Sequence, residues 1–230
     1  ITSTVQANTT AGFSVVTYTG TGSAGTVGHG LGKVPAMVIL KNRDTTNTWL
    51  VKHQNNTSNK NLQLSTTNAE LTTSDFTAGI IGDLSSSTVI SLVLGTGSTN
   101  VSGSGNDYIA YCFAEIEGYS KFGSYTGNGD ADGVFVYTGF KPAWIMLKRT
   151  DGTNDWILFD NKRLGYNGDN KRLYPNQTYV EDTTGFDLLS NGFKARMTGT
   201  TINGSGNSYV YMAFAEHPFV SSKGVPVTAR

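Results

Sequence analysis

The stretch with the clearest metal-binding character is an acidic turn that places side-chain oxygens at alternate positions. Asn128, Asp130 and Asp132 are followed by Gly133, which fits the first half of a calcium loop, N-x-D-x-D-G. In such a loop the alternate oxygens converge on one cation, and the glycine permits a sharp turn. The second half does not fit, because position twelve is Gly139 where a bidentate glutamate is expected. A polar hairpin turn is the first interpretation, and a calcium site is the alternative.

Tyrosines and basic residues gather in the longest polar segment of the sequence, which runs from Asn161 to Thr184. The candidate ligand-binding residues in it are Tyr166, Tyr174, Lys162, Arg163, Lys171 and Arg172. Four more tyrosines lie beside predicted loops: Tyr119, Tyr125, Tyr137 and Tyr179. A tyrosine offers a rigid ring and a hydroxyl group, which suits contacts with sugars or proteins. The segment is therefore the predicted recognition surface, and it is also where we expect a few helical residues.

The sequence shows no pattern of a catalytic site. Its histidines, His29, His53 and His217, are scattered and lack the spacing of zinc ligands. Glu115 and Glu216 occupy equivalent places in the repeat described next, which explains them without catalysis. No predicted helix follows the glycine-rich strings, as a dinucleotide site would require. We predict a non-enzymatic protein with no catalytic residue and no cofactor besides the calcium alternative; a polysaccharide depolymerase is a further alternative.

Two long matches within the chain predict a tandem duplication. At a spacing of 107 residues, Tyr18–Gly20 matches Tyr125–Gly127. At a spacing of 101 residues, Ser102–Glu115 matches Asn203–Glu216. A repeat of about 105 residues has the size of one β-sandwich, whereas solenoid repeats run roughly 20–50 residues. The matches therefore predict two homologous units.

Short apolar runs between turn clusters, with little helical periodicity, predict an all-β fold. We expect two tandem jelly-roll or lectin-like β-sandwiches, residues 1–120 and 121–230. The strands predicted in the first are Phe13–Thr19, Thr26–His29, Ala36–Asn42, Trp49–His53, Asn61–Ser65, Thr88–Leu94 and Tyr108–Glu115. Those predicted in the second are Gly133–Tyr137, Ala143–Lys148, Trp156–Phe159, Arg172–Tyr174, Gly192–Thr198 and Ser208–Glu216. The runs Ala36–Leu40 and Ile109–Ala114 are apolar on both faces, which predicts central strands.

Composition limits the classes of partner. Charged residues make up 15% of the chain and the formal net charge is zero, so we predict no nucleic-acid partner. No apolar stretch approaches the roughly 18 residues of a membrane span, so we predict no membrane insertion. The single cysteine, Cys112, excludes an intramolecular disulfide and is predicted to be buried in a strand. The first residues lack a signal-peptide pattern and an initiator Met, from which we expect a piece of a longer protein.

Four long strings carry a resemblance to known proteins: Gly28–Trp49, Tyr111–Asp151, Phe186–Arg196 and Asn203–Phe219. In these strings the chain resembles a duplicated β-rich domain of tail-fibre-like and other virion-associated proteins of tailed bacteriophages, especially marine phages and cyanophages. The resemblance covers nearly the whole chain, from about Thr10 to Phe219.

The resemblance implies a location more than a chemistry. It predicts a virion protein in an extracellular surface appendage such as a tail fibre, with other virion proteins and host cell-surface glycans or proteins as partners. Trimeric assembly is usual for phage fibres, so a homo-oligomer is expected by analogy. The leading function is a structural and adhesion module. A capsid-decorating or head-fibre protein is the alternative within the virion.

Overall fold

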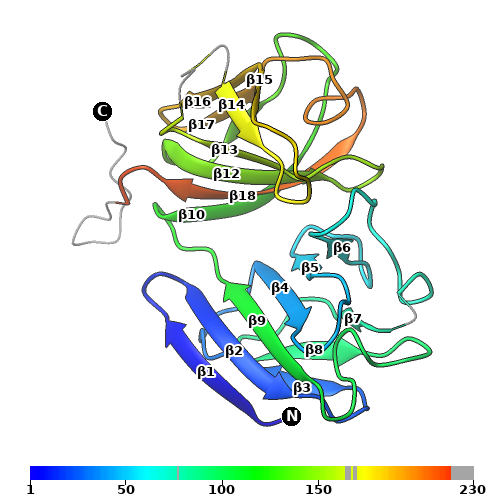
Figure 1. Ribbon diagram of the computed structural model, residues 1–230. Coiled ribbons are helices and arrows are strands. Elements are labelled where there is room, and N and C mark those ends of the chain that lie inside the picture. Colours follow the sequence, from blue (N-terminus) through cyan, green and yellow to red (C-terminus); the bar gives the residue numbers. More distant parts are fainter. Residues whose placement is uncertain (77, 164–166, 168–169, 219–230) are drawn as a thin grey trace. The chain divides into compact units, whose positions relative to one another are not determined.

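The computed structural model describes residues 1–76, 78–163, 167 and 170–218. Every regular element among these residues is a β-strand and none of them lies in a helix, so the all-β prediction is confirmed (Figure 1). No helix that could cross a membrane is present in this part of the chain. The chain forms two compact units, Ile1–Glu115 and Ile116–Arg230, which we call unit 1 and unit 2. This boundary precedes the one expected from the sequence, which follows residue 120.

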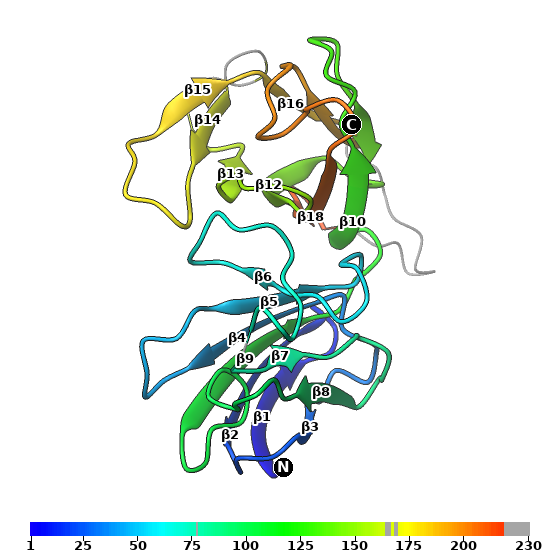
Figure 2. The ribbon, with the colours of Figure 1, turned by 90° about the vertical axis from the view of Figure 1, so that its right-hand side faces the viewer.

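Unit 1 consists of a six-stranded and a three-stranded antiparallel sheet. The larger sheet has the order β1-β2-β9-β4-β5-β6, with bounds Ser3–Asn8, Phe13–Thr19, Asp107–Phe113, Met37–Asn42, Leu50–His53 and Leu62–Gln63. The smaller sheet has the order β3-β8-β7, with bounds Gly25–Gly28, Val89–Val93 and Ile80–Ile81. Figure 2 shows the smaller sheet facing the larger one. The two strands predicted to be central are β4 and β9, which lie in the middle of the larger sheet.

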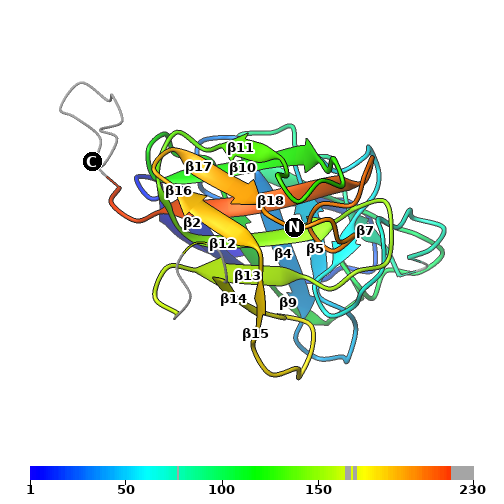
Figure 3. The same ribbon diagram turned by 90° about the horizontal axis from the view of Figure 1, so that it is seen from above.

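Unit 2 is built in the same way, again from sheets of six and three strands. The larger sheet has the order β10-β18-β12-β13-β14-β15, with bounds Ser120–Thr126, Ser208–Ala215, Pro142–Arg149, Ile157–Asp160, Asn170–Leu173 and Asp182–Thr184 (Figure 3). The smaller sheet has the order β11-β17-β16, with bounds Phe135–Tyr137, Gly192–Ala195 and Phe186–Leu189. Apart from the edge strands β1 and β15, each strand of unit 1 has a counterpart at the same place in the strand order of unit 2. A duplication predicts this order.

Each unit encloses its own apolar core between its two sheets, which is the arrangement of a β-sandwich. In unit 1, Val38 of β4 and Ile90 of β8 belong to one buried cluster. In unit 2, Phe159 of β13 stacks on Phe186 of β16 with ring centroids 3.9 Å apart. The two clusters have no residue in common. Cys112 lies in the first core, as predicted, and burial raises the pKa of its thiol to about 12.

A pair of stacked tyrosines recurs in the two units. Tyr18 of β2 stacks on Tyr108 of β9 with ring centroids 5.0 Å apart, and Tyr125 of β10 stacks on Tyr209 of β18 at 4.9 Å. All four hydroxyls donate hydrogen bonds to backbone carbonyl oxygens, at 2.6 to 2.8 Å. Because a buried hydroxyl without a partner is costly, these bonds fix the rings in place. The Tyr18 and Tyr125 match found in the sequence therefore marks equivalent buried positions.

The structure corrects the prediction at several edges of the sheets. The segment Asn161–Thr184 was expected to contain helical residues; its described residues include the strands β14 and β15 and no helix, and Leu164–Tyr166, Gly168 and Asp169 lie outside the described residues. Five strands were not predicted at all: β1, β7, β10, β15 and β16. The edge strands β1 and β10 have the polar sequences STVQAN and SKFGSYT. An edge strand needs only one paired neighbour and can present polar residues to water, so its apolar signal is weak.

Candidate functional site

The predicted recognition segment folds as the hairpin β14–β15 at the edge of the larger sheet of unit 2. Asn170 of β14 is buried, and its side-chain amide donates a hydrogen bond to the carbonyl oxygen of Phe186 in β16. In the loop between the strands, Asn176 accepts a hydrogen bond from the N–H of Trp156 at 2.9 Å and donates one to the carboxylate of Asp155 at 2.8 Å. The hairpin and its loop are therefore attached to the sandwich by side-chain hydrogen bonds.

An ion pair across the hairpin orients one of the predicted tyrosines. Arg172 of β14 lies opposite Asp182 of β15, and its guanidinium donates to both carboxylate oxygens at 2.7 and 2.8 Å. The hydroxyl of Tyr174 donates to the same carboxylate at 2.9 Å, and the guanidinium lies 5.1 Å from the centre of the Tyr174 ring. The bonds from Arg172 hold the pKa of Asp182 below its usual value. Burial, together with the neighbouring carboxylate, raises the pKa of Tyr174 to about 12, so the tyrosine is protonated at neutral pH.

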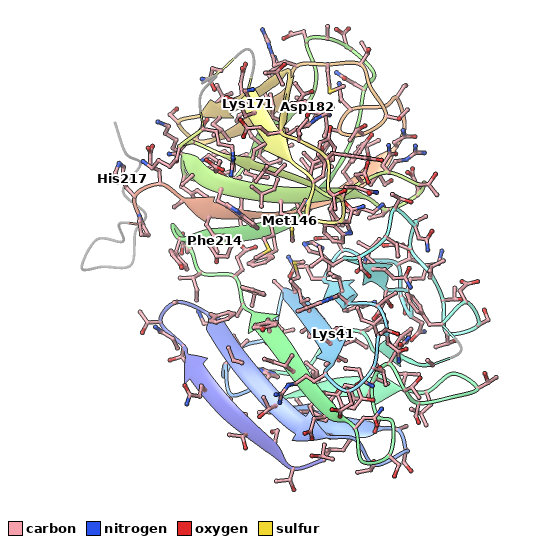
Figure 4. All side chains as sticks on the ribbon, in the orientation of Figure 1. Lys41, Met146, Lys171, Asp182, Phe214 and His217 are labelled. Atoms are coloured by element: carbon pink, nitrogen blue, oxygen red, sulfur yellow. The ribbon has the colours of Figure 1, made fainter. Side chains whose placement is uncertain are left out.

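Most other basic residues of the predicted set are paired with acids. Arg163 contacts Asp160 and Glu181, each at 2.8 Å. Lys171, labelled in Figure 4, lies 3.8 Å from Glu181. Lys162 is exposed. Since acidic partners balance most of the positive charge around the hairpin, the arrangement does not favour an anionic ligand over a neutral one.

The loop between β14 and β15 presents an exposed aromatic ring, Tyr179, which the sequence analysis named as loop-adjacent but did not include in the candidate ligand-binding set. Tyr179 is 60% exposed and Val180 is 85% exposed. The Tyr179 ring stands at 83° to the ring of Tyr174, with centroids 5.4 Å apart, which is a favoured edge-to-face geometry. The sequence signal that could have indicated this exposed site was the pair Tyr179 and Val180, an aromatic and an aliphatic residue side by side in a polar segment. Tyr166, the other tyrosine of the predicted set, lies outside the described residues.

The acidic turn of unit 2 is anchored by one fully buried side chain, Asn203. Its amide group donates to the side-chain oxygen of Asn128 at 2.9 Å and to the carbonyl oxygens of Asp130 and Met197, both at 2.8 Å. The side-chain oxygen of Asn128 also accepts a hydrogen bond from the N–H of Asp130 at 3.0 Å. The oxygen expected to begin a calcium loop is therefore used to shape the turn.

Asp132, the last acid of the turn, has basic neighbours. Lys194 and Arg196 lie 2.7 and 2.6 Å from its carboxylate, and the bond from Lys194 is the main cause of its lowered pKa. Two positive side chains at one carboxylate oppose the binding of a cation there. In the part of the chain that the structure describes, no group of three His, Cys, Asp or Glu side chains could hold a metal ion. For Asn128, Asp130 and Asp132 these contacts support the polar-turn interpretation.

Two more aromatic rings are exposed on β11. Phe135 is 44% exposed and Tyr137 is 63% exposed, on either side of a buried valine. At the equivalent places in β3, unit 1 has Thr26 and Gly28, so the fold does not require rings at these positions. Together with Tyr179, these are the exposed aromatic side chains among the described residues. All of them belong to unit 2.

The fold and the surface define a class: an all-β protein of two sandwich units, whose second unit presents aromatic side chains to solvent. A family model described as "Domain of unknown function (DUF7483)" matches residues 1–218. The chain therefore belongs to this family, and the match extends across both units. No curated protein and no solved structure matches the chain.

Proposed function

We propose that this chain is a non-enzymatic structural and adhesion module of a bacteriophage virion, within a tail fibre or a similar appendage, and that it binds glycans of the host surface. The observation that supports the binding role is the fixed hairpin of unit 2, which holds the exposed ring of Tyr179 against Tyr174. The location in the virion rests on the sequence resemblance to fibre-like phage proteins.

The chemistry of the hairpin suits a neutral sugar. A sugar ring combines apolar C–H groups, which pack on aromatic rings, with hydroxyl groups that need polar partners. The hairpin offers the ring of Tyr179 beside the carboxylate of Asp182 and the guanidinium of Arg172, whose charges offset each other. Because Arg172 and Asp182 are held by hydrogen bonds and the ring of Tyr179 packs against that of Tyr174, little conformational entropy is lost when a ligand binds.

Tyr179→Ala is expected to weaken binding of the purified chain to immobilised bacterial surface polysaccharides about tenfold, which corresponds to about 1.4 kcal/mol. The expected loss arises because the substitution removes the exposed ring while leaving the hydrogen bonds of the hairpin intact. Tyr137→Ala is the matched control, since it removes a ring of similar exposure from β11. Equal losses in both variants, or no binding by the unaltered chain, would contradict the assignment to the hairpin. Release of reducing ends from the same polysaccharides would contradict a non-enzymatic role.

Antibodies raised against the chain are expected to label the tail region of virions that contain it, as seen by electron microscopy with gold-conjugated secondary antibodies. The physical reason is that an adhesion module must reach the host surface before the capsid does. Virions incubated with pre-immune serum provide the control. Labelling of the capsid surface would refute the appendage assignment and would favour a capsid-decorating protein.

A further inference from the structure

Unit 1 contains a pocket of about 650 Å³ at one end of its larger sheet. This volume lies within the range of about 300–1,000 Å³ that is typical of small-molecule sites. The pocket is lined by residues of β1, β2 and β9 and by Arg43, which follows β4. Five threonines contribute to the lining, together with Asp107 and Ile1; Tyr18 and Tyr108 also border the pocket, although their rings are buried in the core. The lining thus combines hydroxyl groups, the carboxylate of Asp107 and the guanidinium of Arg43.

A row of polar side chains crosses three neighbouring strands at this pocket. Thr19 is the register partner of Asp107, and its hydroxyl donates to the Asp107 carboxylate at 2.9 Å. Arg43 follows directly in the same row, because its N–H donates to the carbonyl oxygen of Asp107 at 2.8 Å. Side chains that lie directly opposite each other on neighbouring strands project from the same face of a sheet. Thr19, Asp107 and Arg43 therefore present a hydroxyl, a carboxylate and a guanidinium side by side.

The guanidinium of Arg43 is available to a ligand. Arg43 is exposed, and its side chain makes no hydrogen bond or ion pair with any residue that the structure describes. The carboxylate of Asp107 is oriented by Thr19 and retains further acceptor sites, since an ionised carboxylate has about four lone pairs available. The row therefore has unused donors and unused acceptors at adjacent positions.

Unit 2 shows that the fold does not need this pair of charges. The backbone bond from Arg43 to Asp107 in unit 1 corresponds to the bond from Thr150 to Ser208 in unit 2, at 2.9 Å. The two units thus have the same backbone geometry here, but unit 2 has hydroxyl side chains in place of the base and the acid. A neighbouring contact is also the same in both units. In unit 1 the carboxylate of Asp44 accepts a hydrogen bond from the N–H of Asp107, and in unit 2 the carboxylate of Asp151 accepts one from the N–H of Ser208. Only the charged side chains of the row differ, which favours a role in binding.

We propose that the pocket of unit 1 is a second saccharide site, which takes a neutral sugar through a pair of neighbouring hydroxyl groups. Each sugar hydroxyl both donates and accepts, so one hydroxyl of the pair accepts from Arg43 while the other donates to Asp107. Hydrogen bonds with charged partners are stronger than those between neutral groups. The carboxylate of Asp107 disfavours acidic sugars and phosphate, because its negative charge lies beside Arg43 and repels an anionic ligand. This site deepens the proposed glycan-binding function, but it does not depend on the hairpin of unit 2.

The experiment uses the full chain and two substitutions that transfer the residues of unit 2 to unit 1, Arg43→Thr and Asp107→Ser. Binding of neutral hexose mono-, di- and trisaccharides is measured by calorimetry, with glucuronate and inorganic phosphate as anionic probes. We expect the unaltered chain to bind a neutral saccharide and each variant to lose at least tenfold in affinity. The thermal unfolding midpoint is expected to change little, because residues of these types occupy the equivalent places in unit 2.

Tyr179→Ala separates this proposal from the one for the hairpin. Saccharide binding that is lost in the two unit 1 variants and retained in Tyr179→Ala supports the pocket, even if the hairpin proves not to bind. Binding that is lost only in Tyr179→Ala refutes the pocket and supports the hairpin. The pocket proposal is also overturned if no neutral saccharide binds, or if glucuronate or phosphate binds more tightly than the neutral sugars.

Discussion

Replacing Phe193 with alanine is expected to lower the free energy of unfolding of unit 2 by about 3–5 kcal/mol. Phe193 of β17 is fully buried, and its ring centroid lies 5.9 Å from that of Tyr125, 5.2 Å from that of Phe186 and 5.1 Å from that of Tyr211. The substitution removes these contacts from both sheets and leaves a cavity that the surrounding strands fill only in part. Hydrogen exchange, read by mass spectrometry, is expected to accelerate in the strands of unit 2.

Ile90→Ala in β8 is the matched variant for unit 1. Ile90 pairs with Val27 as Phe193 pairs with Val136, so the two residues occupy equivalent places in the smaller sheets. The expected loss is about 2–5 kcal/mol. Because the two cores share no residue, each variant is expected to accelerate exchange mainly in its own unit. Equal acceleration in both units by either variant would show that the cores do not unfold separately.

Lys148→Met is expected to raise the free energy of unfolding at pH 7 by about 2 kcal/mol. The Lys148 side chain is fully buried on β12, and burial lowers its pKa from 10.5 to about 8. A shift of this size corresponds to about 3 kcal/mol of unfavourable charge burial. Methionine carries no charge and so avoids this cost of charge burial. It cannot, however, donate the hydrogen bond that Lys148 gives to the carbonyl oxygen of Arg149 at 2.7 Å. Losing that bond costs about 1 kcal/mol.

The stability gain expected for Lys148→Met depends on pH, because the folded and unfolded proteins release the Lys148 proton at different pH values. Below pH 8 both the folded and the unfolded protein carry the charged lysine, so the folded state bears the full unfavourable term. Between about pH 8 and pH 10.5 the unfolded chain still binds the proton that the folded protein has released, so the stability of the unaltered protein rises with pH. The advantage of Lys148→Met is therefore expected to be largest below pH 8 and to shrink towards pH 10.5. Denaturant titrations of the unaltered protein and of Lys148→Met at several pH values measure this difference in the free energy of unfolding.

Lys41→Met provides the control in unit 1. Lys41 on β4 has the place that Lys148 has on β12, but it is only partly buried and donates to the carbonyl oxygens of Asn42 and Thr45 at 2.5 and 2.7 Å. Burial lowers the pKa of Lys41 as well. Because Lys41 is less buried than Lys148, its substitution is expected to raise the free energy of unfolding by less. A loss of stability in Lys148→Met at pH 7, or the same pH dependence in both variants, would contradict the assigned cause.

The sequence predicted the inner strands well because their residues face apolar surroundings. The predicted strand Phe13–Thr19 has the same bounds as β2, and the predicted central strands are β4 and β9. In β2, buried and partly exposed residues alternate strictly up to the last position, which gives the period-2 signal. Edge strands lack this signal, and β1 and β10 were missed for that reason.

The candidate site was predictable only in its location. The segment that contains Tyr174 was identified from its composition, but the pairing of Arg172 with Asp182 depends on the register of β14 and β15, a hairpin that the sequence did not predict. The same register places acids beside the basic residues and leaves Tyr179 as the exposed ring. The pocket of unit 1 was not predictable, because Thr19, Arg43 and Asp107 come from three separate parts of the sequence and meet only through strand pairing.

The buried amide of Asn203 has a consequence for how unit 2 can vary. It fixes the acidic turn through Asn128 and the backbone of Asp130, and the carboxylate of Asp130 accepts a hydrogen bond from the N–H of Asp132 at 2.8 Å, whereas the side chain of Ala131 is exposed. A new residue in place of Ala131 leaves the anchoring contacts and the apolar core untouched. The turn is therefore a natural display loop, where foreign peptides can be grafted onto the sandwich and where diversity in surface recognition can accumulate without a penalty in folding.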